Sequence, residues 1–308
     1  MPPETTPSRW TNATVRAVLR SPHRDALIDD DLGFHTEDGS QFPVEDRILC
    51  LLPESERGVD LGDGGFYDRH PFGESTRADR DAVVAGVERE LQELLREYPH
   101  SALVLDVGAG AGRVFRYLEL QGFENAVGLD FSLPSLRRLR VHGTNPLIWG
   151  NNLRLPLATG AFDLVISTGV AHHTSDPHRA IEECLRVLAP GGRLYLRVYN
   201  RQSAYYCAHR TYGAAMRALD ARAPTRRPGD FLGFGLYKWM RSTLFSRREL
   251  PDHLLRAKYG NLFLKHQVYF FTAGEIESLW TNHHVDVESA SRQGATHRMH
   301  CHVVRKPA

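Results

Sequence analysis

The stretch Ala102–Arg113, ALVLDVGAGAGR, joins an apolar run to a glycine-rich turn. Its first four residues are apolar without alternation, which is typical of a parallel strand buried on both faces, and Asp106 marks where the strand leaves the core. Three alternating glycines follow: Gly108, Gly110 and Gly112. Glycine allows a ligand to approach the backbone, and the free N–H groups of a helix expected over 111–120 would point at that ligand.

Two alternatives compete with a ligand-binding loop of this kind. One is a glycine-rich turn that holds no ligand. The other is a dinucleotide site, because dinucleotide-binding folds begin in the same way. Their fingerprint, G-x-G-x-x-G, requires a glycine where this chain has Arg113. The third glycine therefore comes one residue early, which disfavours a pyrophosphate ligand.

Strands and helices alternate on both sides of this stretch. An amphipathic helix over 77–98 precedes the first strand, and helices over 133–141 and 177–188 follow it. We expect the strands of this region over 102–106, 126–130, 146–150, 161–167 and 192–199. Strands separated by helices of this length predict an α/β fold with a doubly wound parallel sheet.

Ligands of such a sheet bind outside the carboxyl ends of the strands, where the strand order reverses. Four residues that end or follow strands should meet there: Asp106, Asp130, Asn151 and Thr168. Asp130 can accept hydrogen bonds from a ribose diol, and Phe131 is placed to cover a base. Asn151 and Asn152 offer amide groups to an adenine edge. Since Asp106 suits an ammonium group, the pattern predicts an amino-acid nucleoside as the ligand.

Three successive motifs carry a family resemblance: LDVGAGAGR, GLDFS, and the stretch that runs from NNLRLP to RLYLRVYN. Over about Ser101–Asn200 they resemble class I S-adenosylmethionine (SAM)-dependent methyltransferases of the type 11 kind. The resemblance implies a Rossmann-like, mostly parallel seven-stranded sheet, closed antiparallel by strands over 285–289 and 300–304. It also implies SAM as the cofactor and S-adenosylhomocysteine (SAH) as its product.

The resemblance assigns cofactor-binding roles by position. Asp106 and the glycine loop, Gly108, Gly110 and Gly112, would hold the methionine end, and Asp130 the ribose hydroxyls. Phe131, Asn151 and Asn152 would flank the adenine, and Thr168 would line the methyl side. The family usually has Asp-Ala where this chain has Asn151-Asn152, and an amide can still contact adenine. Tyr67, within FYDRHPFG, would either fold over the ligand as a lid or fasten the N-terminal head to the body.

His172 and His173 follow the fourth strand, beside the expected position of the transferred methyl group. A histidine with a near-neutral pKa could take the proton from an acceptor, which makes both residues candidates for a catalytic base. The H-H-T-x-D-P pattern also recurs in the family as a structural turn. Methyl transfer can in addition proceed by alignment alone in a desolvated site, without a base.

The N-terminal segment Leu19–Glu54 resembles a small zinc-ribbon head found before some methyltransferases. Its Phe42–Asp46 motif, FPVED, is present, but residues 21–24 and 35–39 stand where that head has cysteine pairs. Structural zinc favours soft thiolates, so we predict a degenerate ribbon that binds no metal. His23 and His35 are then ordinary polar residues.

The charges of the chain are unevenly distributed. Residues 1–100 hold 11 basic and 21 acidic residues, whereas the whole chain has a net charge of +1. Residues 201–270 hold 13 basic and 4 acidic residues, interleaved with aromatic residues. We expect this insertion to be a helical lid that selects the substrate. An RNA-binding surface and a solvated helical face packed on the acidic head are the alternatives.

The predicted organisation has five parts: a ribbon-like head (1–60), a covering loop and helix (61–100), the SAM-binding core (101–200), the helical insertion (201–270) and a closing segment (271–308). The four cysteines form no C-x-x-C pair, and no apolar run is long enough to span a membrane. We therefore expect a cytoplasmic protein without a membrane partner, and a homodimer is left open.

The sequence thus favours a SAM-dependent methyltransferase that acts on an O, N or C atom of a small molecule, such as a specialised metabolite. No nucleic-acid partner is expected, because nucleic-acid affinity depends on phosphate neutralisation and the overall charge is near neutral. Two alternatives remain: an RNA methyltransferase that uses the basic insertion, and a SAM-binding partner protein without catalytic activity.

Overall fold

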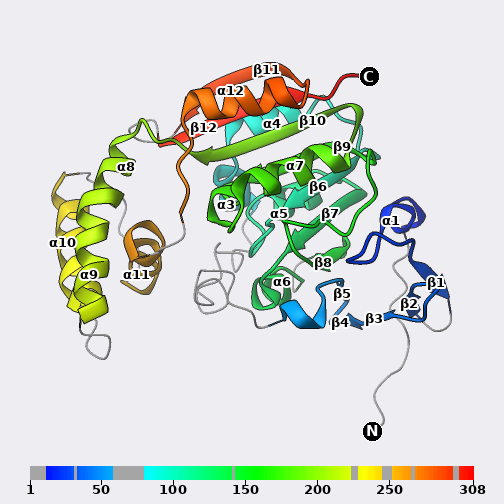
Figure 1. Cartoon of the computed structure of the whole chain (residues 1–308), viewed down its shortest axis with the longest axis horizontal. Coiled ribbons are helices and arrows are strands. Elements are labelled where there is room, and N and C mark those ends of the chain that lie inside the picture. The colour runs from blue at the N-terminus through cyan, green and yellow to red at the C-terminus, as the bar shows by residue number, and fades with distance from the viewer. Residues whose placement is uncertain are drawn as a thin grey trace, which may run out of the picture.

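A computed structural model describes the chain over residues 12–30, 33–57, 80–140, 143–222, 228–244, 252–264, 268–293 and 298–308. Helices cover both faces of a central sheet, as Figure 1 shows. The N-terminal head lies at one edge of this sheet, and a separate group of helices lies at the left of the view, beyond the ends of the strands. The predicted α/β class is confirmed.

The large sheet has nine strands among the described residues, in the order β11-β12-β10-β9-β6-β7-β8-β5-β4. The core strands are β6 (Leu103–Val107), β7 (Asn125–Asp130), β8 (Leu147–Trp149), β9 (Phe162–Thr168), β10 (Leu188–Tyr199), β11 (Asp286–Gln293) and β12 (Met299–Arg305). Strands β6 to β10 pair in parallel, and β12 joins β10 antiparallel. All seven expected strands are present.

Two strands of the head widen the sheet beyond the predicted seven. Strand β5 (Ile48–Cys50) pairs in parallel with β8, and β4 (Val44–Glu45) pairs antiparallel with β5. The edge of β8 would otherwise expose unpaired backbone groups, and β5 satisfies them. Residues 44–50 are therefore part of the core sheet.

The order of the strands decides where a ligand can bind. From β6 the chain proceeds outward to β7 and β8, then returns to β9 on the other side of β6 and continues to β10. The strand order thus reverses between β6 and β9, and loops from the carboxyl ends of both strands diverge there.

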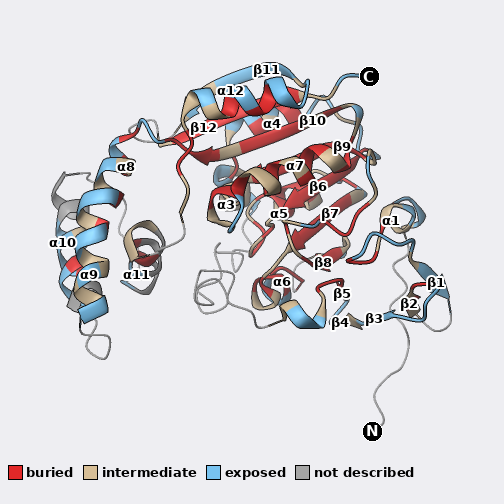
Figure 2. Cartoon of the chain, viewed as in Figure 1, coloured by how far each residue is buried: buried red, intermediate tan, exposed pale blue. Residues whose placement is uncertain are grey.

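Alternate residues of each strand face two separate hydrophobic clusters. Helices α1 (Ala13–Val18), α7 (Pro177–Val187) and α12 (Ala273–Asn282) pack on one face of the sheet. Helices α4 (Arg89–Leu95), α5 (Phe115–Leu120) and α6 (Leu133–Arg140) pack on the other. Figure 2 shows the strands between them as almost continuously buried, which explains their apolar runs without alternation.

Two of the predicted helices begin at the expected residue, a third is broken into two, and a fourth begins late. Helices α6 and α7 begin at Leu133 and Pro177, as expected, and Asp176 caps α7. Thr272 forms a capping box with Glu275 at the start of α12. The helix predicted over 77–98 is instead broken into α3 (Arg80–Gly86) and α4, with Glu88 extended between them. The helix predicted from residue 111 begins only at Phe115, because Gly112 has a φ of +96°.

The head also contains a small antiparallel sheet of β1 (Ile28–Asp30), β2 (Gly33–His35) and β3 (Gln41–Phe42), followed by the 3-10 helix η1 (Glu54–Glu56). Side-chain hydrogen bonds shape the two turns near residues 21–25 and 36–40. Ser21 Oγ donates to Asp25 Oδ2 at 2.9 Å, and Thr36 Oγ1 donates to Asp38 Oδ1 at 2.5 Å. Among the described residues, no three potential metal ligands are grouped. The ribbon assignment itself stays a prediction.

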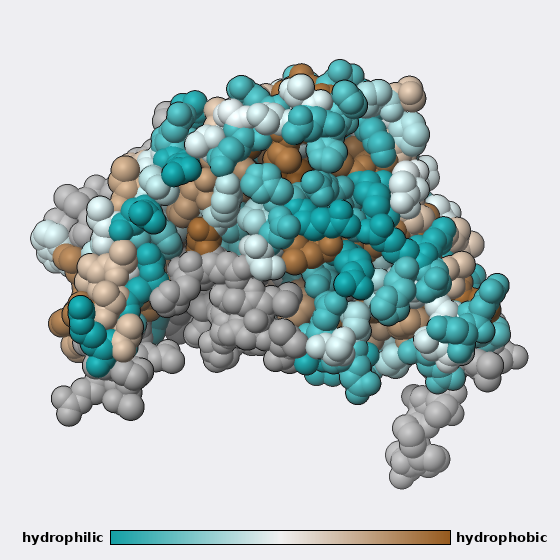
Figure 3. Space-filling model, viewed as in Figure 1, coloured by the Kyte–Doolittle hydropathy of each residue, from teal (hydrophilic) through white to brown (hydrophobic). Residues whose placement is uncertain are grey.

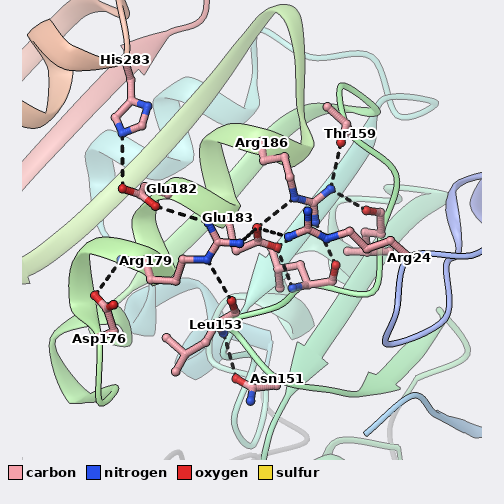
Figure 4. A network of polar contacts seen from close by, with 12 residues as sticks. Arg24, Asn151, Leu153, Thr159, Asp176, Arg179, Glu182, Glu183, Arg186 and His283 are labelled. Atoms are coloured by element: carbon pink, nitrogen blue, oxygen red, sulfur yellow. Dashed lines mark hydrogen bonds and ion pairs between the residues drawn. The ribbon is translucent and has the colours of Figure 1, made fainter. Parts of the chain in front are cut away.

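Ion pairs join the acidic head to the basic body. Arg137 pairs with Asp46 at 2.9 Å, and Arg154 approaches Glu56 at 3.9 Å. A third ion pair between the head and the body has the opposite sense: Arg24 of the head pairs with Glu183 on α7 at 2.8 Å (Figure 4). The negative charge of the head is therefore compensated at least partly by basic residues of the same chain.

The insertion after β10 is helical, as predicted. It comprises α8 (Ala204–Ala208), the π-helix η3 (His209–Gly213), α9 (Ala214–Arg222), α10 (Pro228–Leu244), α11 (Asp252–Tyr259) and the π-helix η4 (Gly260–Leu264). Tyr259 is fully buried in its own small core. Figure 1 places these helices on the side of the sheet opposite the head, so the alternative that they pack on the head is wrong for the described residues.

Part of the insertion surface is apolar. Phe231 and Trp239 on α10 are 71% and 58% exposed. In Figure 3, hydrophobic side chains are interspersed on the protruding helices, whereas hydrophilic ones cover much of the rest of this face. None of the helices in the described part of the chain has the length and hydropathy that crossing a bilayer requires.

Candidate active site

A cavity of about 380 Å³ opens at the carboxyl ends of the parallel strands. Nine of the residues singled out from the sequence line it: Asp106, Gly108, Gly110, Asp130, Phe131, Asn151, Asn152, Thr168 and His173. Its volume lies in the range of small-molecule sites. No described residue of the helical insertion is among those that line the cavity, so the expected lid function of residues 201–270 stays a prediction.

The glycine loop passes from β6 toward α5 with a left-handed backbone at Gly108 and Gly110. A Cβ atom at Gly108 would lie 2.4 Å from Val170 Cγ2, which explains why no larger residue fits there. The amide of Gly110 donates to Asp130 Oδ2 at 2.7 Å, and the amide of Ser132 donates to Asp130 Oδ1 at 2.8 Å. The Asp130 carboxylate therefore holds the loop against β7 and faces the cavity.

Asp106, one residue before the end of β6, lines this cavity and is 3% exposed. Burial raises the pKa of its carboxyl group to about 7, opposed by Arg113 and reinforced by Asp130. Its Oδ2 atom is buried and has no hydrogen-bond partner among the described residues. Such an acceptor is costly unless a donor reaches it, and an ammonium group of a ligand would satisfy it.

The asparagines after β8 have different surroundings. Asn151 Nδ2 donates to Glu56 Oε2 at 2.7 Å, and the Leu153 amide donates to Asn151 Oδ1 at 2.8 Å. Asn152 is 9% exposed, and its buried Oδ1 has no hydrogen-bond partner within the described part of the chain. Of the two, Asn152 therefore has the acceptor that can serve a ligand, while Asn151 shapes the loop.

A cluster of charged side chains that the sequence analysis did not select lines the cavity next to Thr168. Arg113 Nη1 donates to Glu88 Oε1 at 2.5 Å, and Arg197 Nη1 donates to the same oxygen. Arg113 also donates to Thr168 Oγ1. Burial by itself would raise the pKa of Glu88, but the two guanidinium groups hold it below its usual range.

Of the residues in this cluster, only Arg113 has a recognisable signal in the sequence. Arg113 occupies the position where the dinucleotide fingerprint has glycine. Glu88 reaches the cavity because the chain is extended between α3 and α4, which helical periodicity did not reveal. Arg197 lies on β10 opposite Thr168 in the parallel register, a pairing that depends on strand order.

The two candidate histidines occupy different places. His172 is fully buried, its ring lies 3.8 Å from the Tyr199 ring centroid, and its Nδ1 accepts a hydrogen bond from the Tyr199 amide at 3.3 Å. His172 does not line the cavity, which favours a structural role for it. His173 is half-buried, lines the cavity and lies edge-on to Tyr199. Catalysis by either residue stays a prediction.

Two further predicted site residues lie elsewhere. Gly112 does not line the cavity; a Cβ atom there would lie 2.4 Å from Leu139 Cδ1, so its role is to let α6 pack closely against the glycine loop. Tyr67 and the rest of FYDRHPFG lie outside the described residues. The proposed lid of Tyr67 stays a prediction.

Comparisons with known proteins identify the family of this chain. A family model described as "Methyltransferase domain" matches residues 105–196. The ubiquinone/menaquinone biosynthesis C-methyltransferase of Roseobacter denitrificans is 32% identical over 200 residues, which cover 59% of this chain and 79% of that protein. The chain belongs to the class I SAM-dependent methyltransferases.

Other similar proteins carry different names. The probable tRNA methyltransferase 9B of Homo sapiens is 36% identical over 112 residues, which cover 35% of this chain. The chain spans only about a quarter, 24%, of that relative. The solved magnesium protoporphyrin IX methyltransferase of Synechocystis, with bound SAH, superposes with a TM-score of 0.48 at 13% identity over 80% of this chain and 96% of that one.

Members of this family use SAM as the methyl donor, and the residues of the cavity fit it. The buried acceptors of Asp106 and Asn152 stand at the ends of β6 and after β8, with Asp130 between them at the end of β7. They match, in order, an ammonium group, a ribose diol and an amino group of a base.

Proposed function

We propose that this methyltransferase transfers a methyl group from SAM to an O, N or C atom of a small-molecule acceptor bound in the same cavity. The proposal rests on one observation: the residues that line the cavity fall into two groups, one at each end. Polar acceptors follow β6, β7 and β8 at one end, whereas His173, Tyr199 and Met299 line the other. When bound, SAM supplies a methyl group activated by a sulfonium.

The residues at the β6–β8 end of the cavity would bind SAM and orient it. Asp106 would accept the ammonium group of the methionine end, and Arg113 would pair with its carboxylate. Gly108 and Gly110 would cradle it through their backbone. Asp130 would accept hydrogen bonds from the ribose hydroxyls.

The adenine would lie among residues that follow β7 and β8. Asn152 would accept a hydrogen bond from its amino group, Asn151 would hold the loop, and Phe131 would cover the ring. The Phe131 carbonyl accepts a hydrogen bond from Trp149 Nε1 at 2.8 Å, which fixes this loop. Gly112 would keep the loop packed, and Tyr67 would cover the bound ligand.

At the second end, Thr168 would line the methyl side and His173 would face the acceptor. His173 could hold the proton that an acceptor hydroxyl or amine releases, while buried His172 would position it. Alignment of donor and acceptor in a water-excluding cavity would supply much of the rate in either case. The cavity volume and the near-neutral overall charge support an acceptor that is a small molecule.

Two measurements test this proposal. Calorimetric titration with SAH should show binding to the wild type, and incubation with radiolabelled SAM and a small-molecule extract of the source organism should yield a labelled product one methylene heavier. A wild-type protein that does not bind SAH contradicts the cofactor site. One that binds SAH, labels no small molecule and co-purifies with a specific protein supports the non-catalytic alternative.

A second candidate function is RNA methylation. It is supported by the names of the tRNA methyltransferase relatives and by the basic insertion with its 13 basic and 4 acidic residues. Against it, the described residues of that insertion do not line the cavity. Label transferred to tRNA, with salt-sensitive retention of RNA by the protein, would favour this function over the first.

A further inference from the structure

The acceptor end of the cavity carries a positive charge that no described acid neutralises. Arg298 directly precedes β12, is half-buried and lines the cavity. Its guanidinium carbon lies 5.8 Å from the ring centroid of Tyr199 and 5.7 Å from that of Tyr205. None of the carboxylates in the described part of the chain forms an ion pair with it.

The other two arginines of the cavity are already engaged. Arg113 and Arg197 share the Glu88 carboxylate, so this trio has a net charge of +1. In the proposed cofactor pose, Arg113 and Asp106 meet the carboxylate and ammonium groups of the methionine end. The donor sulfonium then adds a further positive charge on the side of β9 and β10. Arg298 therefore completes an electropositive surface at the acceptor end.

Topology separates this surface from the adenine end. Met299 pairs with Tyr199 across β12 and β10, which places Arg298 just beyond the carboxyl end of β10. Strand β12 lies four strand spacings from β7, which carries Asp130. At about 4.8 Å per spacing, Arg298 is about 19 Å from Asp130 along the sheet. Arg298 is thus too distant for the ribose and adenine, and it faces whatever binds beside the methyl group.

We infer that Arg298 binds an anionic group of the acceptor, and that the substrates of this enzyme are small carboxylic acids. The inference rests on the proposed function. A guanidinium presents a planar fork of donors that matches a carboxylate bidentately, and the two tyrosine rings hold that fork in place. A phosphate ester could accept the same pair of hydrogen bonds, and phosphatase treatment distinguishes it from a carboxylate.

The experiment compares three forms of the full-length protein: wild type, Arg298→Gln and Arg298→Lys. A small-molecule extract of the source organism is divided by anion exchange into retained and unretained fractions, and each is incubated with labelled SAM. We expect label only in the retained, anionic fraction. At limiting extract, Arg298→Gln should lower the initial rate by about 10- to 100-fold, because a charge-assisted hydrogen bond is lost. Arg298→Lys should lower it less.

Matched controls make this result specific. SAH affinity should be the same for the wild type and both variants, which also shows that they fold. Arg138→Gln, on the exposed face of α6, removes one arginine elsewhere and should leave the rate unchanged. Phosphatase treatment of the anionic fraction should leave the label intact if the acceptor is a carboxylate; loss of label assigns a phosphate ester and overturns the carboxylic acid assignment.

Three outcomes contradict the inference in different ways. Label from the unretained fraction, or an unchanged rate for Arg298→Gln, overturns the anionic acceptor and leaves the small-molecule methyltransferase intact. Label that disappears after ribonuclease treatment favours RNA as the anion and overturns both proposals. SAH binding without transfer from any fraction overturns the proposed function, and the inference falls with it.

Discussion

The carboxylate of Asp130, at the end of β7, accepts a hydrogen bond from the amide of Gly110 at 2.7 Å. This contact joins two residues that are 20 positions apart and aligns the glycine loop with the strand beside it. The same carboxylate lines the cavity. It holds the loop, and in the proposed function it would also present its oxygen atoms to the ligand.

Asp130→Ala should lower SAH affinity at least about 100-fold, because two ligand hydrogen bonds to a charged group and the loop contact are lost. Calorimetric titration measures the effect. Asp163→Ala is the matched control, since Asp163 Oδ2 likewise accepts a strand amide, that of Leu103, at 2.8 Å, but does not line the cavity. Equal losses of affinity in both variants would contradict the assigned role of Asp130.

SAH affinity should depend on pH through Asp106. If the ionised carboxylate pairs with the ammonium group, a pKa of about 7 means that affinity falls about tenfold as the pH decreases from 8 to 6. Asp106→Asn should bind more weakly and lose this dependence. Titrations at three pH values check the prediction, and a wild type whose affinity does not change would refute it.

Asp106 should also affect the stability of the ligand-free protein. Its pKa is raised from 3.8 to about 7, so the native state holds the proton more tightly than the unfolded chain. The associated stability is present below about pH 4 and is lost as the pH rises through 7, by about 4 kcal/mol at most. Asp106→Asn should therefore be more stable relative to the wild type at pH 8 than at pH 5. Urea unfolding at both pH values tests the sign.

Gly108→Ala should reduce SAH affinity because its Cβ would collide with Val170 at 2.4 Å and displace the loop. Gly191 is a suitable control: its φ of +76° is close to the +74° of Gly108, but a Cβ there meets nothing within 4 Å. Both variants should lose about 1–2 kcal/mol of stability from the left-handed backbone. Only Gly108→Ala should bind SAH more weakly, and a similar loss for Gly191→Ala would contradict the steric explanation.

Glu183→Ala should destabilise the protein by about 3 kcal/mol, because it leaves a cluster of guanidinium groups without their shared anion. The Glu183 side chain is completely buried, and Figure 4 shows the three groups that converge on it, from Arg24, Arg179 and Arg186. Its Oε2 also accepts the Leu155 amide at 2.9 Å. Glu182→Ala, next to it but 38% exposed, should cost less than about 1 kcal/mol. Urea unfolding compares the two, and equal costs would contradict the prediction.

The sequence predicted the sheet well because buried parallel strands are apolar throughout and each is followed by a polar residue. Asp106, Asp130 and Asn152 could be selected on that basis, and all three line the cavity. The edge strands β4 and β5 were missed, since short strands carry little pattern of their own and are defined by pairing with β8. The break before Glu88 was missed because apolar spacing continued across it.

By itself, the sequence determined the order of strands and helices, the glycine loop and the polar residues at the strand ends, because these depend on local periodicity and backbone conformation. Only the tertiary structure decided which charges share the cavity. Glu88, Arg113, Arg197 and Arg298 come from four separate segments and meet because the strand order reverses between β6 and β9 and β12 returns antiparallel to β10. No local pattern encodes that proximity, since it depends on long-range strand pairing.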